Sequence, residues 1–174
     1  MMSADQPRAE TAGMVSMCSL RAGPGLFGID TGQIREVLGA IVPQPVPLAP
    51  EYIAGIVPYR GDVLTTVSLR TLLGLERIAK SSCMLVLDEE GAADRFGLIV
   101  DCVEGVTMMT RVSLTPNPTT LDARCVAVFD GAYSLESGLM VRLNPQRLRP
   151  SRLAQSSLFG VAGPRCKGEH VCER

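Results

Sequence analysis

Residues 53–69, IAGIVPYRGDVLTTVSL, contain the pattern that decides the fold class. Two runs rich in β-branched residues, 53–60 and 63–69, flank the dipeptide Gly61-Asp62. Short β-rich runs on either side of a glycine-containing turn are typical of a β-hairpin. We therefore predict an antiparallel hairpin with its turn at Arg60-Gly61-Asp62, followed by a short helical turn that ends at Gly74.

Similar short runs extend in both directions from this hairpin. Further strands are predicted at residues 14–20, 26–29, 36–42, 83–87, 96–101, 103–109, 124–129 and 138–143. Residues 32–35 should form a helical turn, and residues 145–153 a terminal helix with Pro145 in its first turn. Four prolines within residues 43–50 predict a stiff surface loop, because proline removes backbone donors. Many short strands separated by turns are typical of small β-barrels.

The composition limits the classes of protein that the chain can belong to. Its 174 residues are 46% hydrophobic and only 4% aromatic, without tryptophan, which suits one globular unit and disfavours base-stacking nucleic-acid binders. No apolar run has the length of a signal peptide or a membrane span, so we expect a cytoplasmic protein. We predict a disordered leader at residues 1–13, a folded domain at 14–153 and a flexible basic tail at 154–174.

Few residues could carry out catalysis. His170, close to the C-terminus, is the single histidine, and no P-loop or nucleophile motif is present. Residues 23–28, GPGLFG, match the pattern of a dinucleotide-binding loop, but they are followed by a strand rather than a helix, which favours hairpin glycines. We therefore predict that the chain is not an enzyme and that it binds no cofactor.

The cysteines and the charge distribution leave two other functions open. Four of the six cysteines lie in apolar runs and are predicted to be buried free thiols: Cys18, Cys83, Cys102 and Cys125. Cys166, His170 and Cys172 could form a zinc or redox switch, although a structural zinc site normally needs four ligands, so no metal is predicted. The net charge is −6 over residues 1–141 and +5 over 142–174, so a nucleic-acid binder that uses the tail is an alternative.

Several blocks of sequence occur together in a recognisable order. They are FGID at 27–30, IREVL at 34–38, PLAPEYIAGIVPYRG at 47–61, VSLR at 67–70, RFGLIVDCVEGV at 95–106 and GLMVRLNP at 138–145. Together they resemble the CheW family of bacterial chemotaxis coupling proteins over about residues 14 to 153. The resemblance implies a mainly β fold of two small five-stranded SH3-like barrels that share an apolar core. It also implies a non-catalytic adaptor that joins chemoreceptor tips to the regulatory domain of a CheA-type histidine kinase.

The resemblance also implies a binding site. In the family the receptor tip lies in the groove between the barrels, near the positions that match Ile34, Glu36, Gly55, Arg60, Gly61, Gly97 and Val103. Kinase contacts would come from exposed barrel surfaces, and weak self-association in arrays is plausible. On physical grounds alone Arg60 fits two roles, a solvated turn arginine or an interface anchor, because a guanidinium can project from a rigid turn.

The chain departs from the family at three places. Pro58-Tyr59 precede Arg60-Gly61 where the family usually has Asn-Leu. Ser68 stands where the family usually has an aspartate, which leaves open what orients Arg60 and Arg70. The glycine expected in a late strand has no clear counterpart near residues 125–128.

Overall fold

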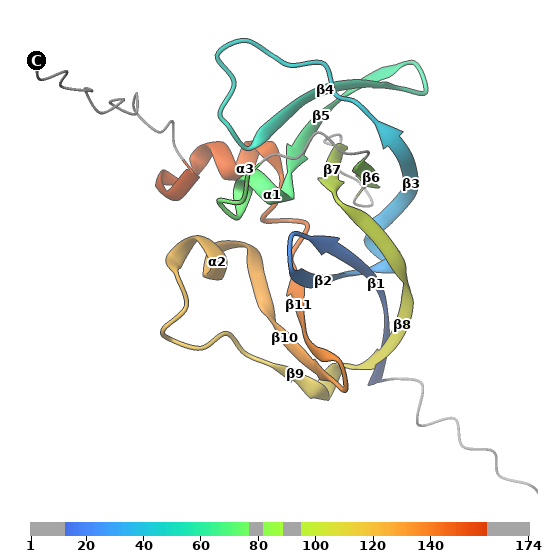
Figure 1. Ribbon diagram of the computed structural model, residues 1–174, viewed down its shortest axis with the longest axis vertical. Coiled ribbons are helices and arrows are strands. Elements are labelled where there is room, and N and C mark those ends of the chain that lie inside the picture. Colours follow the sequence, from blue (N-terminus) through green and yellow to red (C-terminus); the bar gives the residue numbers. More distant parts are fainter. Residues whose placement is uncertain (1–12, 77–81, 89–94, 160–174) are drawn as a thin grey trace, which may run out of the picture.

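The computed structural model describes residues 13–76, 82–88 and 95–159, which form two β-sheets placed one above the other in Figure 1. Sheet A consists, in spatial order, of β8 (Cys102–Thr110), β1 (Met14–Ala22), β2 (Gly25–Asp30), β11 (Gly138–Leu143), β10 (Phe129–Leu135) and β9 (Leu114–Thr115). Sheet B consists of β3 (Ile34–Ile41), β6 (Ser82–Leu87), β7 (Phe96–Val100), β5 (Asp62–Ser68) and β4 (Ile53–Tyr59). Neighbouring strands are antiparallel except for the pairs β2–β11 and β5–β7.

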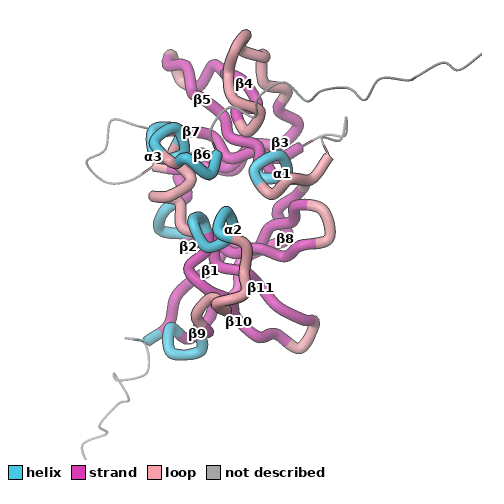
Figure 2. The backbone as a smooth tube through the Cα atoms, turned by 90° about the vertical axis from the view of Figure 1, so that its left-hand side faces the viewer, coloured by secondary structure: helices cyan, strands magenta, loops and turns pink. Residues whose placement is uncertain are grey.

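Short helices connect or follow the strands. The α-helices are α1 (Leu69–Leu72), α2 (Ala123–Val128) and α3 (Pro150–Gln155), and the 3-10 helices are η2 (Thr31–Gln33), η3 (Arg111–Ser113) and η4 (Ser157–Phe159). Figure 2 shows α1, α2 and α3 on the same side of the molecule. None of the helices in the described ranges has the length and hydropathy that crossing a membrane requires.

The core joins the two sheets. Its largest cluster combines fully buried side chains of sheet A, such as Leu20 and Ile29, with Leu85 and Leu98 of sheet B. A second cluster lies within sheet A around Tyr133, and a third within sheet B. The predicted mainly β fold with a shared apolar core is therefore confirmed. Sheet B has the expected five strands, and sheet A has a sixth because of the two-residue strand β9.

Two predicted elements differ from the structure. Residues 124–129 were expected to form a strand, but residues 123–128 form α2. The Asp122 side chain caps the start of this helix by accepting a hydrogen bond from the Arg124 N–H at 2.8 Å. The terminal helix begins at Pro150 rather than Pro145. The residues after Pro145 form a turn instead. In this turn the Asn144 side chain accepts a hydrogen bond from the Gln146 N–H at 3.0 Å.

The prediction of buried cysteines is correct only in part. Cys18 is buried, whereas Cys83 and Cys125 are half-buried and Cys102 is exposed, and all four are free thiols. Cys102 lies on β8, an edge strand of sheet A whose outward side chains have no covering layer. The predicted leader lies almost entirely outside the described residues. So does most of the predicted tail, of which residues 154–159 complete α3 and form η4.

Candidate functional site

The turn between β4 and β5 holds an arginine in an unusual backbone conformation. Arg60 has φ of 50° and Gly61 has φ of 87°, between the paired residues Tyr59 and Asp62. Two central residues with positive φ define a type I′ turn, in which the first position is normally Asn, Asp or Gly. An arginine there costs about 1–2 kcal/mol of backbone strain. The turn therefore holds Arg60 in a left-handed backbone conformation that glycine or asparagine would adopt with less strain.

Arg60 is held in place by Glu36 and Tyr59. The Arg60 Nη2 donates to Glu36 Oε2 at 2.9 Å, and the Tyr59 hydroxyl donates to the same oxygen at 2.6 Å. The Arg60 guanidinium carbon also lies 5.4 Å from the centroid of the Tyr59 ring. The Arg60 side chain remains 64% exposed and that of Glu36 is 32% exposed. The guanidinium is therefore oriented by its neighbours while most of its surface faces solvent.

These contacts shift the titration of both charged groups. The hydrogen bond from Tyr59 lowers the pKa of the Glu36 carboxyl, and the bond and the charge of Arg60 lower it further, against a smaller opposing effect of burial. The hydrogen bond and the charge of Glu36 raise the pKa of Arg60. Both groups therefore remain charged at neutral pH.

The same contacts close sheet B. Glu36 lies on β3 and Tyr59 on β4, which are the two outer strands of this sheet. A hydrogen bond between outer strands requires the sheet to curl until its edges meet, which makes a small half-open barrel. On the outer edge of β4, opposite β5, Gln44 exchanges two backbone hydrogen bonds with Ile56, so the proline-rich loop covers part of that edge.

Three of the predicted site residues lie in one row across sheet B. The strand registers place Glu36 beside Val86, Val86 beside Gly97, Gly97 beside Thr66, and Thr66 beside Gly55. Thr66 also donates its hydroxyl hydrogen to the Gly55 carbonyl at 2.8 Å. The row thus runs from Glu36 on β3 to Gly55 on β4, the strand that leads into the Arg60 turn.

The two glycines of this row are buried and act through packing. A Cβ atom at Gly97 would lie 2.5 Å from the Met84 sulfur and 2.9 Å from Thr66 Cγ2. Gly55 has φ of 146°, and a Cβ there would collide with the Gln44 carbonyl. Both positions thus require glycine for the barrel to close. They shape the site and offer no side chain to a partner.

Ile34 and Val103 border the central core from different sheets. Ile34 begins β3 of sheet B, and Val103 lies on β8 of sheet A beside Leu20. Both are half-buried and pack against the central cluster. Of the seven predicted site residues, the structure therefore brings Glu36, Arg60 and Gly61 to one exposed corner. It leaves Ile34 and Val103 at the junction of the sheets.

Asp101 is a residue whose role the sequence reasoning missed. Its Oδ2 accepts from Arg70 Nη1 at 2.6 Å and from the Gly23 N–H at 2.7 Å, so α1 of sheet B and the β1–β2 turn of sheet A share one carboxylate. Asp101 thus orients Arg70, and Glu36 orients Arg60. Ser68, at the position where the family usually has aspartate, caps α1 by accepting from the Thr71 N–H at 3.3 Å.

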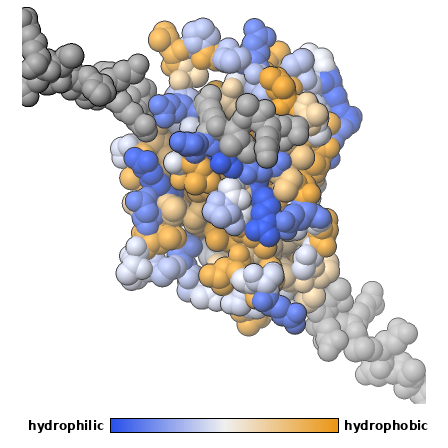
Figure 3. Space-filling model, viewed as in Figure 1, coloured by the Kyte–Doolittle hydropathy of each residue, from blue (hydrophilic) through white to orange (hydrophobic). Residues whose placement is uncertain are grey.

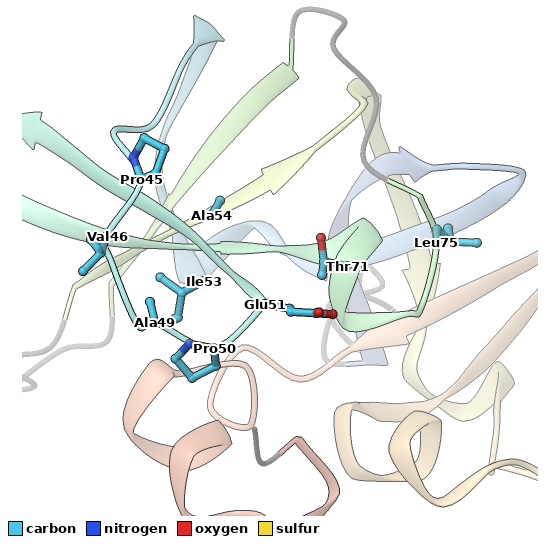
Figure 4. Close-up of a pocket in the computed structure, with 9 residues that line it drawn as sticks. All are labelled: Pro45, Val46, Ala49, Pro50, Glu51, Ile53, Ala54, Thr71 and Leu75. Atoms are coloured by element: carbon cyan, nitrogen blue, oxygen red, sulfur yellow. The ribbon is translucent and has the colours of Figure 1, made fainter. Parts of the chain in front are cut away.

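A pocket of about 500 Å³ lies beneath the proline-rich loop. Figure 4 shows its wall formed by the loop residues Pro45, Val46 and Ala49, with α1 and Leu75 on the opposite side. In this view the Glu51 side chain extends toward Thr71. The loop is thus the stiff surface loop that its prolines predict, folded back over a hollow with a mixed polar and apolar lining.

The described residues contain no cluster of three or more His, Cys, Asp or Glu side chains that could hold a metal ion. Cys166, His170 and Cys172 lie outside the described residues, so the alternative of a zinc or redox switch is untested. The same holds for most of the basic tail on which the nucleic-acid alternative rests.

Comparison with known families gives the decisive observation. A model of the CheW-like domain matches residues 16–152, which is most of the chain. The chain belongs to the CheW family. CheW proteins are non-catalytic adaptors of chemotaxis signalling, so the predicted absence of enzymatic activity follows from membership of the family.

Individual CheW proteins support the assignment. A chemotaxis protein CheW of Rhizobium meliloti (strain 1021) is 26% identical over 108 residues, covering 62% of this chain and 70% of that protein. A chemotaxis protein CheW of Treponema pallidum (strain Nichols) is 20% identical over 155 residues, covering 86% and 90%. The crystal structure of the scaffolding protein TtCheW from Thermoanaerobacter tengcongensis has a TM-score of 0.65 and 25% identity, covering 75% of this chain and 88% of that one.

Proposed function

We propose that this chain is a cytoplasmic adaptor that binds the cytoplasmic tip of a methyl-accepting chemoreceptor and the regulatory domain of a CheA-type histidine kinase. Membership of the CheW family supports these two classes of partner. The receptor contact is assigned to the groove that the family resemblance implies, and the kinase contacts to other exposed barrel surfaces.

The observation that carries the receptor contact is the orientation of Arg60. A strained turn, the Glu36 carboxylate and the Tyr59 ring hold the guanidinium in place while 64% of its side chain stays exposed. An arginine fixed in this way loses little conformational entropy on binding, which makes it an effective interface anchor. Ile34 and Val103 supply apolar surface at the junction of the sheets, where a helix of the receptor tip would be buried.

The test must separate a contact made by Arg60 from its effect on barrel closure. Arg60→Glu reverses the charge but also places two carboxylates together. The double variant Glu36→Arg, Arg60→Glu restores an ion pair across the same corner with its charges exchanged. Arg111→Glu is the matched control, since Arg111 is exposed on η3 and has no ion pair within the described residues.

Calorimetric titration should use a receptor-tip fragment and the kinase regulatory domain separately. We expect Arg60→Glu and the exchanged pair to weaken receptor binding by about tenfold or more, which corresponds to one lost charge-assisted contact. Both variants should bind the kinase domain as tightly as the wild type does. Arg111→Glu should bind both the receptor fragment and the kinase domain with wild-type affinity. Recovery of receptor binding by the exchanged pair would show that Arg60 acts only by closing the barrel. Failure of the folded wild type to bind either partner would contradict the proposed function.

A further inference from the structure

A second concave surface lies between α2, α3 and η4. Its volume is about 310 Å³, and its apolar wall consists of Ala127, Leu153 and Phe159. Leu153 and Phe159 belong to the central core, and Phe159 stacks edge-on against Tyr52 with ring centroids 6.4 Å apart. The wall is therefore a fixed part of the fold, and we name this surface the α2–α3 pocket.

Two arginines lie at the α2–α3 pocket. Arg147 Nη1 lies 3.4 Å from the carbonyl oxygens of Val126 and Phe129 and 3.6 Å from Asp130 Oδ1, so its guanidinium is held beside the end of α2. Arg152 projects from α3, is exposed and has no ion pair within the described ranges. The pocket thus combines an apolar wall with one positioned guanidinium and one uncompensated guanidinium.

The surrounding sequence strengthens this positive charge. Residues 142–159, which include α3 and η4, contain four arginines and no acidic residue. Figure 3 shows hydrophilic and hydrophobic residues interspersed along the margin where α2 and α3 lie. An apolar hollow beside excess positive charge is complementary to a ligand that carries an apolar group next to carboxylates.

We propose that the α2–α3 pocket binds an acidic segment of a partner protein, with one large apolar side chain in the pocket and a neighbouring carboxylate on Arg152. Arg147 supplies a second, partly neutralised guanidinium beside the same apolar wall. This contact is separate from the receptor contact at Arg60 and does not depend on it.

Charge disfavours the segment of this chain that begins closest to the pocket. Residues 160–174 follow η4 directly, but they contain three basic and two acidic residues. Their net positive charge would be repelled by Arg152. A flat anionic membrane would pair its negative charges with the arginines, but it would not fill the pocket lined by Ala127, Leu153 and Phe159.

The probe is a fluorescein-labelled decapeptide with a single phenylalanine flanked by four glutamates, titrated into the full chain and followed by fluorescence anisotropy. One control peptide replaces the phenylalanine by glycine, and another replaces the glutamates by lysines. Arg152→Glu is compared with Arg111→Glu, which makes the same charge change on another exposed arginine. Arg152→Gln is the milder second variant if Arg152→Glu unfolds α3.

We expect the glutamate–phenylalanine peptide to bind the wild type with an affinity that falls as salt is raised. Arg152→Glu should weaken it by about tenfold or more, and Arg111→Glu by less than twofold. Loss of the phenylalanine should also weaken binding.

Several results would overturn the proposal. These are failure of the wild type to bind the peptide, equal effects of the two arginine variants, and equal binding of the glycine peptide. Tighter binding to phosphatidylserine vesicles that Arg152→Glu abolishes would assign the surface to a membrane instead. A dimer in sedimentation experiments that Arg152→Glu dissociates would assign it to a second copy of this chain.

Discussion

Arg70 Nη1 lies 2.6 Å from Asp101 Oδ2, and both side chains are about four-fifths buried, at 18% and 20% exposure. The pair connects α1, which follows the last residue of β5, to the β7–β8 junction, where the chain passes from sheet B to sheet A. The Gly23 N–H donates to the same oxygen from the β1–β2 turn. One carboxylate therefore fixes how three segments from the two sheets meet.

Asp101→Ala should destabilise the fold more than the loss of an exposed ion pair does. The substitution removes the acceptor of Arg70 Nη1 and of the Gly23 N–H, while Arg70 Nε keeps the Glu76 carbonyl. We expect it to lower the free energy of unfolding by about 2 kcal/mol. Glu104→Ala, which removes the exposed pair with Arg21, should cost below about 1 kcal/mol. Urea unfolding followed by circular dichroism measures both values. Equal costs would contradict the special role of Asp101.

Gly97→Ala should reduce stability because its methyl group would overlap the Met84 sulfur and Thr66 Cγ2. Overpacking of this kind costs about 1–3 kcal/mol, so the thermal midpoint should fall. Gly39→Ala is the matched control, since a Cβ at Gly39 meets nothing within 4 Å. It should leave the melting temperature nearly unchanged. A loss of receptor binding by Gly97→Ala without a loss of stability would show that Gly97 contacts the partner directly.

The Glu36 carboxyl should titrate below an ordinary glutamate. Its pKa is lowered in the folded state by Tyr59 and Arg60, so its ionised form stabilises the fold above the ordinary glutamate pKa of about 4.3. This contribution is lost as the pH falls through the lowered value. Carbon-13 NMR of the Glu36 carboxyl measures the pKa directly, and Tyr59→Phe should raise it. A pKa at the ordinary value in the wild type would mean that the hydrogen bonds do not persist in solution.

Thiol reactivity should separate the described cysteines. Cys102 is exposed on an edge strand, whereas Cys18 is buried and burial raises the pKa of its thiol. Maleimide should therefore modify Cys102 in the native protein well before Cys18, because the thiolate is the reactive species and needs access. Peptide mapping by mass spectrometry distinguishes these residues from the cysteines of the tail. Similar rates for Cys18 and Cys102 would indicate that sheet A opens readily.

The elements that sequence reasoning predicted correctly are those with local signals. The hairpin of β4 and β5 needs only two β-rich runs and a glycine in the turn, and all of these lie within residues 53–69. The error at α2 has a similar origin. The run from Cys125 to Val128 is apolar and suits a strand, but the helix is set by a cap at Asp122, outside that run.

The sequence predicted positions for the candidate site but not how they are arranged. Family resemblance indicated Glu36 and Arg60 separately, whereas their ion pair exists because the outer strands of sheet B meet. Asp101 was visible in the sequence as the end of an apolar strand. Its partners Gly23 and Arg70 are distant along the chain, and no local pattern connects them.

The type I′ turn makes position 60 a place where thermal stability and partner recognition select different residues. Glycine or asparagine would relieve the positive φ that Arg60 adopts, at the loss of the guanidinium that faces solvent. A directed-evolution experiment that rewards only heat resistance should therefore enrich these residues at position 60. A second selection for adaptor activity should restore the arginine.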